Sequence, residues 1–469
     1  MTKVAVIGLD SVPPSLLFDK LLERLPNFRR LYQGGLHGDL RTCDPPITVP
    51  AWMVMMTGRN PGKLGIYGFR HRKPGSYKDG YIVNSAHVRE ETVWDALARA
   101  GKKSVVLGVP PGYPPKPLKD GNVVSCFLTP SKERPFTYPE ELKKEILDLT
   151  GGRYEFDVTF RTEDRDTIKR ELFDMTRTRL EVAKHLAKRK PWDFFIMHEI
   201  GFDRLHHAFW KYFDPSHPKY VKGNKYEHIA EEYYEAFDRG LGELLRAMPK
   251  DTVTFVLSDH GSKGMKGGFC VNQWLEREGY LRFRAKPAPA TDLDKADVDW
   301  AKTKAWGWGG YYARIFFNVQ GREPQGVVPP VDLEAEKSAF AKKVMSIKDG
   351  EGGPMSNEVF EPDKLYGTAV GDKPDLMVYF GGLDWRSAGT VGHDSLYLSE
   401  NDTGPDDSVH SMEGVFMANV PGKDLGGREL RGLRIQDIGP TLLKLYGLSY
   451  QDEAGVDGNA IPEVVEACR

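Results

Sequence analysis

The stretch that most constrains the fold is an uncharged apolar run ending in two metal-binding side chains. It reads Val-Thr-Phe-Val-Leu-Ser-Asp-His from Val253 to His260. A short run without charges and rich in β-branched residues is typical of a strand buried on both faces, as in a parallel sheet. Asp259 and His260 then stand at its carboxyl end, the edge where ligands bind in open α/β sheets. Gly261 and Gly264 follow and allow a tight turn.

Elsewhere apolar runs alternate with amphipathic stretches, which predicts an α/β fold built from βαβ units. The chain has 469 residues, enough for one large α/β core with insertions or for two domains. Pro-, Lys- and Glu-rich sequence indicates an insertion at about 110–165, and a mixed segment indicates another at about 285–370; we expect both to cover the substrate face. Strands are predicted over 4–9, 104–109 and 192–200, and helices over 16–32, 91–100 and 227–248.

Composition argues against several classes of partner. The chain has 65 basic and 67 acidic residues, so no long-range field favours a nucleic acid polymer or an acidic membrane. No apolar run approaches the roughly 20 residues that span a bilayer. The four cysteines lie far apart, without the spacing of a metal site or a disulfide framework. We therefore expect a soluble cytoplasmic protein, whose oligomeric state the sequence does not decide.

Further candidate ligands stand at the ends of other predicted strands. Asp10 follows the first strand, although a carboxylate there also serves as a helix N-cap. Asp203 and His207 are four apart and share a helix face, so both can bind one ion. His410 begins a late strand and, taken alone, is more often a structural histidine. Thr48 lies between prolines that direct it to a helix N-terminus, where it either caps the helix or faces an anion.

The ends of parallel strands meet at one sheet edge, so these residues are predicted to form two metal sites. Carboxylate and imidazole ligands suit zinc, with manganese or iron as alternatives. Two such ions about 4 Å apart can clamp the entering and leaving oxygens of an in-line phosphoryl displacement. One predicted site contains Asp203, His207 and His410, and the other contains Asp10, Asp259, His260 and the Thr48 oxygen.

In order and spacing, these motifs resemble the alkaline phosphatase superfamily, in particular its type I phosphodiesterase/nucleotide pyrophosphatase branch and the prokaryotic phosphohydrolase/phosphomutase group. The resemblance implies a single catalytic domain over 1–469. It also implies a three-layer α/β/α sandwich with a mostly parallel central sheet, two divalent metal ions and a phospho-threonine intermediate. The motifs that carry the resemblance are Asp10, Thr48-Val49-Pro50 with Thr57-Gly58, Asp203 with His207, Asp259-His260, and His410.

The chain departs from the family where the phosphate is held. Nucleotide pyrophosphatases carry an Asn a few residues beyond a Gly-Ile pair, whereas here Gly65-Ile66 is followed by Gly68, Phe69 and Arg70. The substrate grip can instead use Arg70, His71 or Arg72, unless these belong to a solvated loop. His198 and His217 lack nearby acidic partners and are assigned to packing or to the surface.

The leading interpretation is hydrolysis of a phosphodiester or pyrophosphate bond in a small phosphorylated substrate, which a nucleotide would satisfy. Thr48 is the nucleophile in this interpretation. The alternative is a phosphomonoesterase or a cofactor-independent phosphomutase, which needs a lid that excludes water. A sulfatase is disfavoured because Thr48 replaces the Cys or Ser of those enzymes. A metal-binding protein without turnover would lack a nucleophile or a ligand, and neither is missing.

Overall fold

The computed structural model describes residues 3–469, and its main body is a ten-stranded sheet. The strands β9, β1, β8, β5 and β6 are parallel neighbours in that order, while β19 runs antiparallel between β9 and β2. The sheet is thus mostly parallel, as predicted. Its strands are β1 (Lys3–Leu9), β2 (Leu36–Arg41), β5 (Ser104–Leu107), β6 (Asn122–Val124), β7 (Thr137–Tyr138), β8 (Phe194–Glu199), β9 (Thr252–Leu257), β19 (Glu413–Asn419), β20 (Arg428–Glu429) and β21 (Leu433–Arg434).

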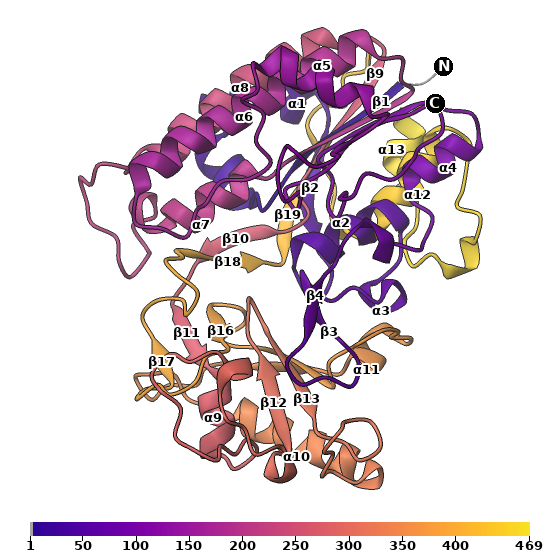
Figure 1. Cartoon of the computed structure of the whole chain (residues 1–469). Coiled ribbons are helices and arrows are strands. Elements are labelled where there is room, and N and C mark those ends of the chain that lie inside the picture. The colour runs from indigo at the N-terminus through magenta and orange to yellow at the C-terminus, as the bar shows by residue number, and fades with distance from the viewer. Residues whose placement is uncertain (1–2) are drawn as a thin grey trace.

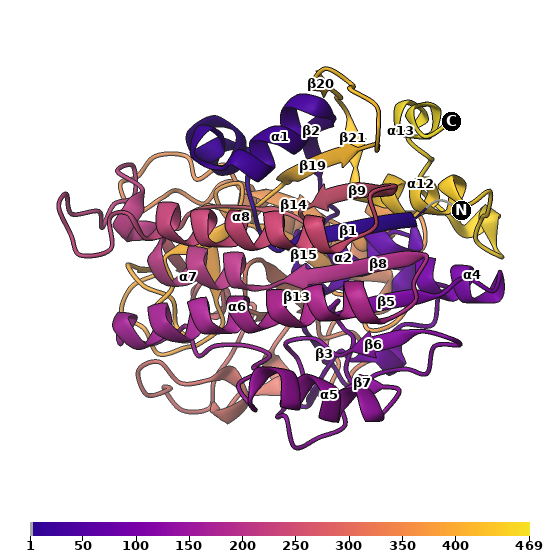
Figure 2. The ribbon, with the colours of Figure 1, turned by 90° about the horizontal axis from the view of Figure 1, so that it is seen from above.

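Helices cover both faces of this sheet (Figure 2). Along β1, Ala5 and Ile7 pack into one hydrophobic cluster and Val4 and Val6 into the other, because side chains alternate along a strand. The first face carries α1 (Pro26–Gly34), α5 (Glu141–Thr150), α6 (Arg165–Arg189), α7 (Gly201–Phe213) and α8 (Ile229–Ala247), and the second carries α2 (Thr48–Thr57), α4 (Val93–Arg99), α12 (Ile438–Leu445) and α13 (Pro462–Ala467).

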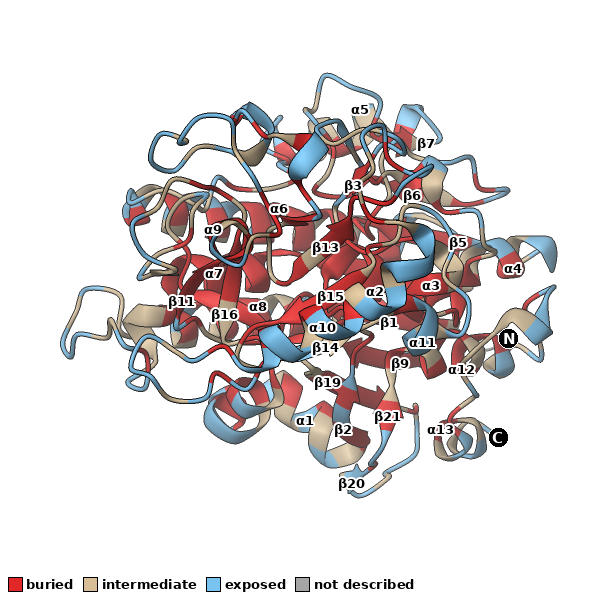
Figure 3. Cartoon of the chain, turned by 90° about the horizontal axis from the view of Figure 1, so that it is seen from below, coloured by how far each residue is buried: buried red, intermediate tan, exposed pale blue. Residues whose placement is uncertain are grey.

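The fold is therefore a three-layer α/β/α sandwich, which confirms the predicted fold class. Burial follows this plan: the central strands and the inner helix faces are buried, and exposed backbone lies mainly in the outer loops and helix surfaces (Figure 3). In the described part of the chain, no helix is both long and apolar enough to cross a membrane.

A second lobe lies below the carboxyl edge of the sheet (Figure 1) and has its own hydrophobic cluster. The segment predicted as an insertion at 285–370 falls within it, but the lobe also includes β11 and β17 on either side, because their side chains pack into the same cluster. Its elements are β11 (Gly267–Cys270), α9 (Val271–Arg277), β12 (Ala305–Trp308), β13 (Ala313–Phe317), α10 (Leu333–Met345), β14 (Glu358–Phe360), α11 (Pro362–Tyr366), β15 (Leu376–Tyr379), β16 (Trp385–Ala388) and β17 (Tyr397–Leu398).

Two small pieces connect the lobe to the sandwich. The strands β10 (Gly261–Gly264) and β18 (Ser408–Ser411) pair as an antiparallel ribbon. The hairpin of β3 (Arg70–Arg72) and β4 (Gly80–Ile82) follows the short helix α3 (Pro61–Leu64) and reaches towards the lobe (Figure 1).

The other predicted insertion, 110–165, contributes β6 and β7 to the edge of the central sheet and α5 to one helical layer, so it does more than cover the substrate face. Division of the chain into domains stays a prediction.

Candidate active site

The predicted site residues meet at the carboxyl edge of the parallel strands. Strand β1 pairs with β8 and β9, so the residues that follow these three strands lie side by side. Asp10 follows β1, and Asp259 and His260 follow β9. The helix α7 starts directly after β8 and carries Asp203 in its first turn. This shared edge therefore explains how residues far apart in sequence converge.

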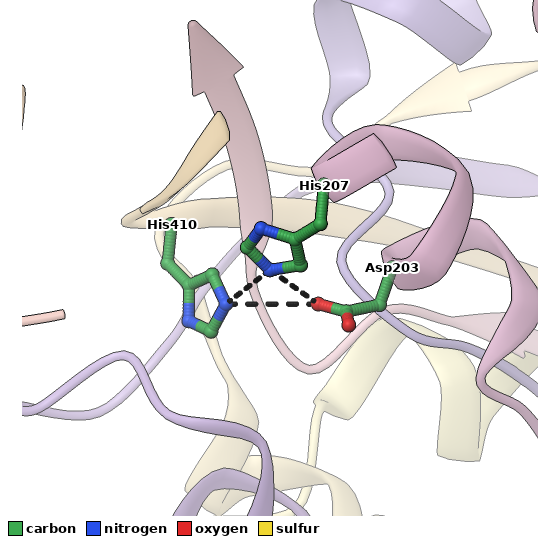
Figure 4. Close-up of side chains that lie close together, drawn as sticks. All are labelled: Asp203, His207 and His410. Carbon is green, nitrogen blue, oxygen red and sulfur yellow. Dashed lines mark hydrogen bonds and ion pairs between the residues drawn. The ribbon is translucent and has the colours of Figure 1, made fainter. Parts of the chain in front are cut away.

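Asp203, His207 and His410 form the first cluster (Figure 4). The Nε2 atom of His207 lies 3.2 Å from Oδ1 of Asp203 and 3.4 Å from Nε2 of His410. The distance between His410 Nε2 and the same Asp203 oxygen is 3.6 Å. Three potential ligand atoms thus point at one small volume.

Asp10, Asp259 and His260 form the second cluster. The Nε2 atom of His260 lies 3.3 Å from Oδ2 of Asp259 and 3.8 Å from Oδ1 of Asp10. The rings of His260 and His410 stack with centroids 3.9 Å apart, so the two clusters adjoin. The structure brings all six predicted carboxylates and imidazoles together in this arrangement.

The three imidazoles are oriented by contacts on their far side. Nδ1 of His410 lies 2.6 Å from the Pro46 carbonyl oxygen, and Nδ1 of His260 lies 3.0 Å from the Gly261 carbonyl oxygen. Nδ1 of His207 lies 2.7 Å from Oδ1 of Asp406. Each contact places the ring proton on Nδ1 and leaves the Nε2 lone pair facing the cluster, the arrangement that metal-binding histidines adopt.

The carboxylates also fit divalent cations. Asp203 Oδ1 and Asp259 Oδ2 are buried without a hydrogen-bond donor among the described residues. Burial, and then the charge of Asp10, raise the pKa of Asp259 well above its ordinary value. A buried carboxylate beside a second one is costly unless a cation compensates for it. This donor set suits zinc, manganese or iron.

Thr48 is the first residue of α2 and is buried beside the second cluster. Its Oγ1 lies 3.4 Å from Oδ1 of Asp10 and 3.3 Å from Nε2 of His260. The N-cap position of α2 belongs to Ile47, so Thr48 is not the cap of this helix. The hydroxyl therefore sits at a helix N-terminus that favours an anion, next to the candidate ligands.

His198 is buried and packs against Trp52, as expected of a packing residue, but the prediction that it lacks an acidic partner is wrong. Its Nε2 lies 2.6 Å from Oδ2 of Asp10, which also accepts a hydrogen bond of 3.2 Å from Nε1 of Trp52. The strand β8 places His198 beside β1, a contact that only the strand order reveals. His217 does not contact either cluster.

Two further residues that the sequence did not single out touch the first cluster. Asp406 orients His207, and an Asp-Asp pair shortly before His410 was the available signal. Tyr311 comes from the loop between β12 and β13 of the second lobe. Its ring stacks on His410 at 3.8 Å, and its hydroxyl lies 3.0 Å from Nε2 of His207. Nothing in the local sequence around Tyr311 indicates this position.

A cleft of about 1010 Å³ opens between the lobe and the sandwich beside the clusters, and Ile47 and Tyr311 line it. Among the three predicted substrate-binding residues, Arg70 lines the cleft, but His71 and Arg72 do not. His71 is buried and its Nε2 accepts a hydrogen bond from the Tyr67 amide.

Arg72 instead joins the β3–β4 hairpin to the second lobe. It forms buried ion pairs with Glu323 at 2.6 Å and Asp372 at 2.9 Å. Both carboxylates belong to the lobe, and both are far from Arg72 in sequence, so no local pattern indicates this structural role.

The sequence matches the family model of type I phosphodiesterase/nucleotide pyrophosphatase over residues 4–406. The match covers most of the chain and includes every candidate ligand except His410. The chain belongs to this family. It is therefore a phosphohydrolase, as the sequence motifs predicted. Comparison with curated proteins gave no match.

Solved structures share the fold of this phosphodiesterase-family chain. Human ectonucleotide pyrophosphatase/phosphodiesterase 5 is 13% identical, with a TM-score of 0.58 and 99% of each chain covered. An inactive variant of the murine protein, in complex with AMP, gives the same values. Phosphonoacetate hydrolase from Sinorhizobium meliloti 1021, in complex with phosphonoformate, is 15% identical, with a TM-score of 0.59 and 93% of this chain and 94% of that chain covered.

Proposed function

We propose that this enzyme hydrolyses a phosphodiester or pyrophosphate bond in a small phosphorylated substrate, with Thr48 as nucleophile and two divalent metal ions as cofactors. The position of the Thr48 hydroxyl carries this proposal. It lies within 3.4 Å of both Asp10 and His260 in one cluster, and the His260 ring stacks on His410 of the other. Zinc is the preferred metal, with manganese or iron as alternatives.

The six clustered carboxylates and imidazoles would hold the two ions, with the Thr48 oxygen as a seventh ligand in the second site. When bound, such ions neutralise charge on phosphoryl oxygens and lower the pKa of a nearby hydroxyl. Thr48 attacks phosphorus in line, the bond from phosphorus to the leaving oxygen breaks, and a phospho-threonine forms. Water then cleaves the new bond and restores the hydroxyl. The amides at the start of α2 face the phosphoryl oxygens throughout.

The cleft provides room for the group attached to the phosphoryl. Aromatic side chains line it, among them Tyr81, Phe69 and Trp308, and suit a planar group such as a nucleobase. A nucleotide is therefore our candidate substrate, and the AMP bound to the murine relative agrees with this choice. The four free cysteines support the proposed cytoplasmic location.

The decisive experiment compares bis-p-nitrophenyl phosphate with p-nitrophenyl phosphate in the presence of zinc or manganese. We expect the diester to be preferred, and Thr48→Ala to lower kcat by at least about 10³-fold, as expected when a nucleophile is removed. Thr178→Ala is the matched control, because this buried threonine of α6 only donates a hydrogen bond to the Met175 carbonyl.

Two results would count against the proposal. A strong preference for the monoester would favour a phosphomonoesterase instead of a diesterase. Transfer of the phosphoryl group between two positions of a sugar phosphate, without release of inorganic phosphate, would favour a mutase. Metal content, measured by elemental analysis of the dialysed protein, should remain near two ions in Thr48→Ala, because six other ligands are left.

A further inference from the structure

Five arginines line the cleft, and they differ in whether a carboxylate neutralises them. Arg161 and Arg386 pair with Asp406, and Arg204 pairs with Asp157 and Asp203. The remaining two, Arg70 and Arg314, have no carboxylate within 4 Å among residues 3–469. Arg70 is exposed and Arg314 is half-buried, so both guanidinium groups are free to bind an anion that enters the cleft.

Arg314 is held firmly in place. It lies half-buried on β13, and its Nη1 donates a hydrogen bond to the backbone carbonyl of Arg70. Its guanidinium lies 5.2 Å from the ring centroid of Trp308, its partner across the β12–β13 pair. Burial above all, together with the nearby charge of Arg70, lowers the pKa of Arg314 below its ordinary value.

Asp372, a carboxylate close enough to raise the pKa of Arg314, is already paired with another arginine. Oδ1 of Asp372 accepts hydrogen bonds from Nε and Nη2 of Arg72 at 3.1 and 2.9 Å. Asp372 thus compensates the buried Arg72 and not Arg314. The two unpaired arginines form a local concentration of positive charge that faces the cleft.

We propose that Arg314, assisted by Arg70, binds a second anionic group of the substrate, a carboxylate or a phosphate. This group lies at the far end of the arm, the substituent attached to the reacting phosphoryl group, whether the arm leaves when Thr48 attacks or stays bound to phosphorus. This inference rests on the proposed function, since it places the reacting phosphoryl at Thr48. Arg314 stands three residues after Tyr311, whose hydroxyl lies 3.0 Å from His207. Both side chains line the same cleft, so the second anion lies in the cleft that the clusters adjoin.

The aromatic surroundings define the connecting arm. Trp308 supports the guanidinium, and Tyr81 and Ile82 of the β3–β4 hairpin line the same cleft. Ile82 is 54% exposed, which leaves its apolar side chain free to meet a ligand. The substrate class is therefore a phosphoryl compound with a planar arm that ends in an anion.

Binding of arylphosphonates tests this directly, because they contain no ester or anhydride bond for the proposed reaction to cleave. Isothermal titration of the metal-loaded enzyme would use phenylphosphonate, 4-carboxyphenylphosphonate, 1,4-phenylenediphosphonate and the biphenyl homologues of the last two. We expect at least one probe with a second anion to bind about 10- to 100-fold more tightly than phenylphosphonate, as for a charge-assisted hydrogen bond. Comparison of the probes that end in a carboxylate with those that end in a second phosphonate shows which of the two anions Arg314 prefers.

In Arg314→Gln this preference should disappear while affinity for phenylphosphonate changes less than about 3-fold. Arg314→Lys keeps the charge and should retain part of the preference, which also guards against loss of fold. Arg284→Gln is the matched control, because Arg284 is an exposed lobe arginine paired with Asp297 outside the cleft. It should leave all affinities unchanged.

Absence of any preference in the wild type, or an equal loss for all probes in Arg314→Gln, overturns the proposal. The outcome is separable from the proposed function. If the enzyme turns over no diester but shows an Arg314-dependent preference, the hydrolase assignment fails and the anion site stands. If diesters are hydrolysed but probes with a second anion bind no more tightly, the hydrolase assignment stands and the anion site fails.

Discussion

Replacement of Asp406 by Asn tests how the first cluster is built. Asp406 is buried, its Oδ1 lies 2.7 Å from Nδ1 of His207, and its Oδ2 accepts hydrogen bonds from Arg386 at 2.7 Å and Arg161 at 3.1 Å. Asn has nearly the same shape, so the substitution removes the charge and changes little in the packing. His207 then loses the carboxylate that fixes its tautomer and raises its basicity.

The expected size follows from these contacts. Loss of a carboxylate behind a metal-binding histidine lowers metal affinity by about 10- to 100-fold. At saturating metal, this reduces stabilisation by the ion by about 1.4–2.8 kcal/mol. In the metal-free protein, Arg386 loses its buried partner, and breaking such a pair costs about 3–5 kcal/mol. Arg161 is 28% exposed and adds less than about 1 kcal/mol.

The assay is urea unfolding of Asp406→Asn and the wild type, each with and without added zinc, together with a zinc-binding titration. Asp297→Asn is the control, because its side chain is 58% exposed and pairs only with Arg284. If Asp406→Asn loses stability but binds zinc with unchanged affinity, Asp406 serves only as a counter-ion for the arginines, and the reasoning about His207 is wrong.

Two other predictions concern buried charges. Arg72→Met leaves Asp372 without its cation, whereas Glu323 keeps Arg322 at 3.1 Å. The substitution should lower the free energy of unfolding by about 3–5 kcal/mol while kcat changes little; a large loss of kcat in folded protein would contradict this. Burial raises the pKa of Asp407 to about 7 despite the nearby Lys211 and Arg165, so the folded carboxyl holds its proton more tightly than an unfolded one. Its contribution to stability is complete below about pH 4 and lost as the pH rises to about 7. Asp407→Asn should therefore reduce the fall in urea midpoint between about pH 5 and pH 8, and an unchanged fall would refute this assignment.

The parts of the site that the sequence predicts are those determined by local pattern. A strand buried on both faces appears in the sequence as a continuous apolar run. Asp10 and Asp259 could therefore each be located at the end of such a strand without knowledge of the strand order. The four-residue spacing of Asp203 and His207 defines a common helix face on its own. The convergence of these residues then follows from the parallel sheet.

The remaining contacts depend on packing between distant segments. Tyr311 reaches the first cluster only because the second lobe lies below the sheet edge, and its neighbours in sequence give no hint of this. A cation near a nucleophile suggests an anion site, and this pattern alone makes Arg72 a candidate substrate ligand. Two carboxylates about 250 and 300 residues later neutralise it, and only the tertiary structure brings them there.

The lobe is tied to the sandwich by Arg72 on one side of the cleft and by the pair of Arg386 with Asp406 on the other. Swinging the lobe away would have to separate these buried ion pairs, so they hold the lobe against the sandwich. The cleft between the lobe and the sandwich, with a volume of about 1010 Å³ in this arrangement, is therefore the space into which a substrate must fit.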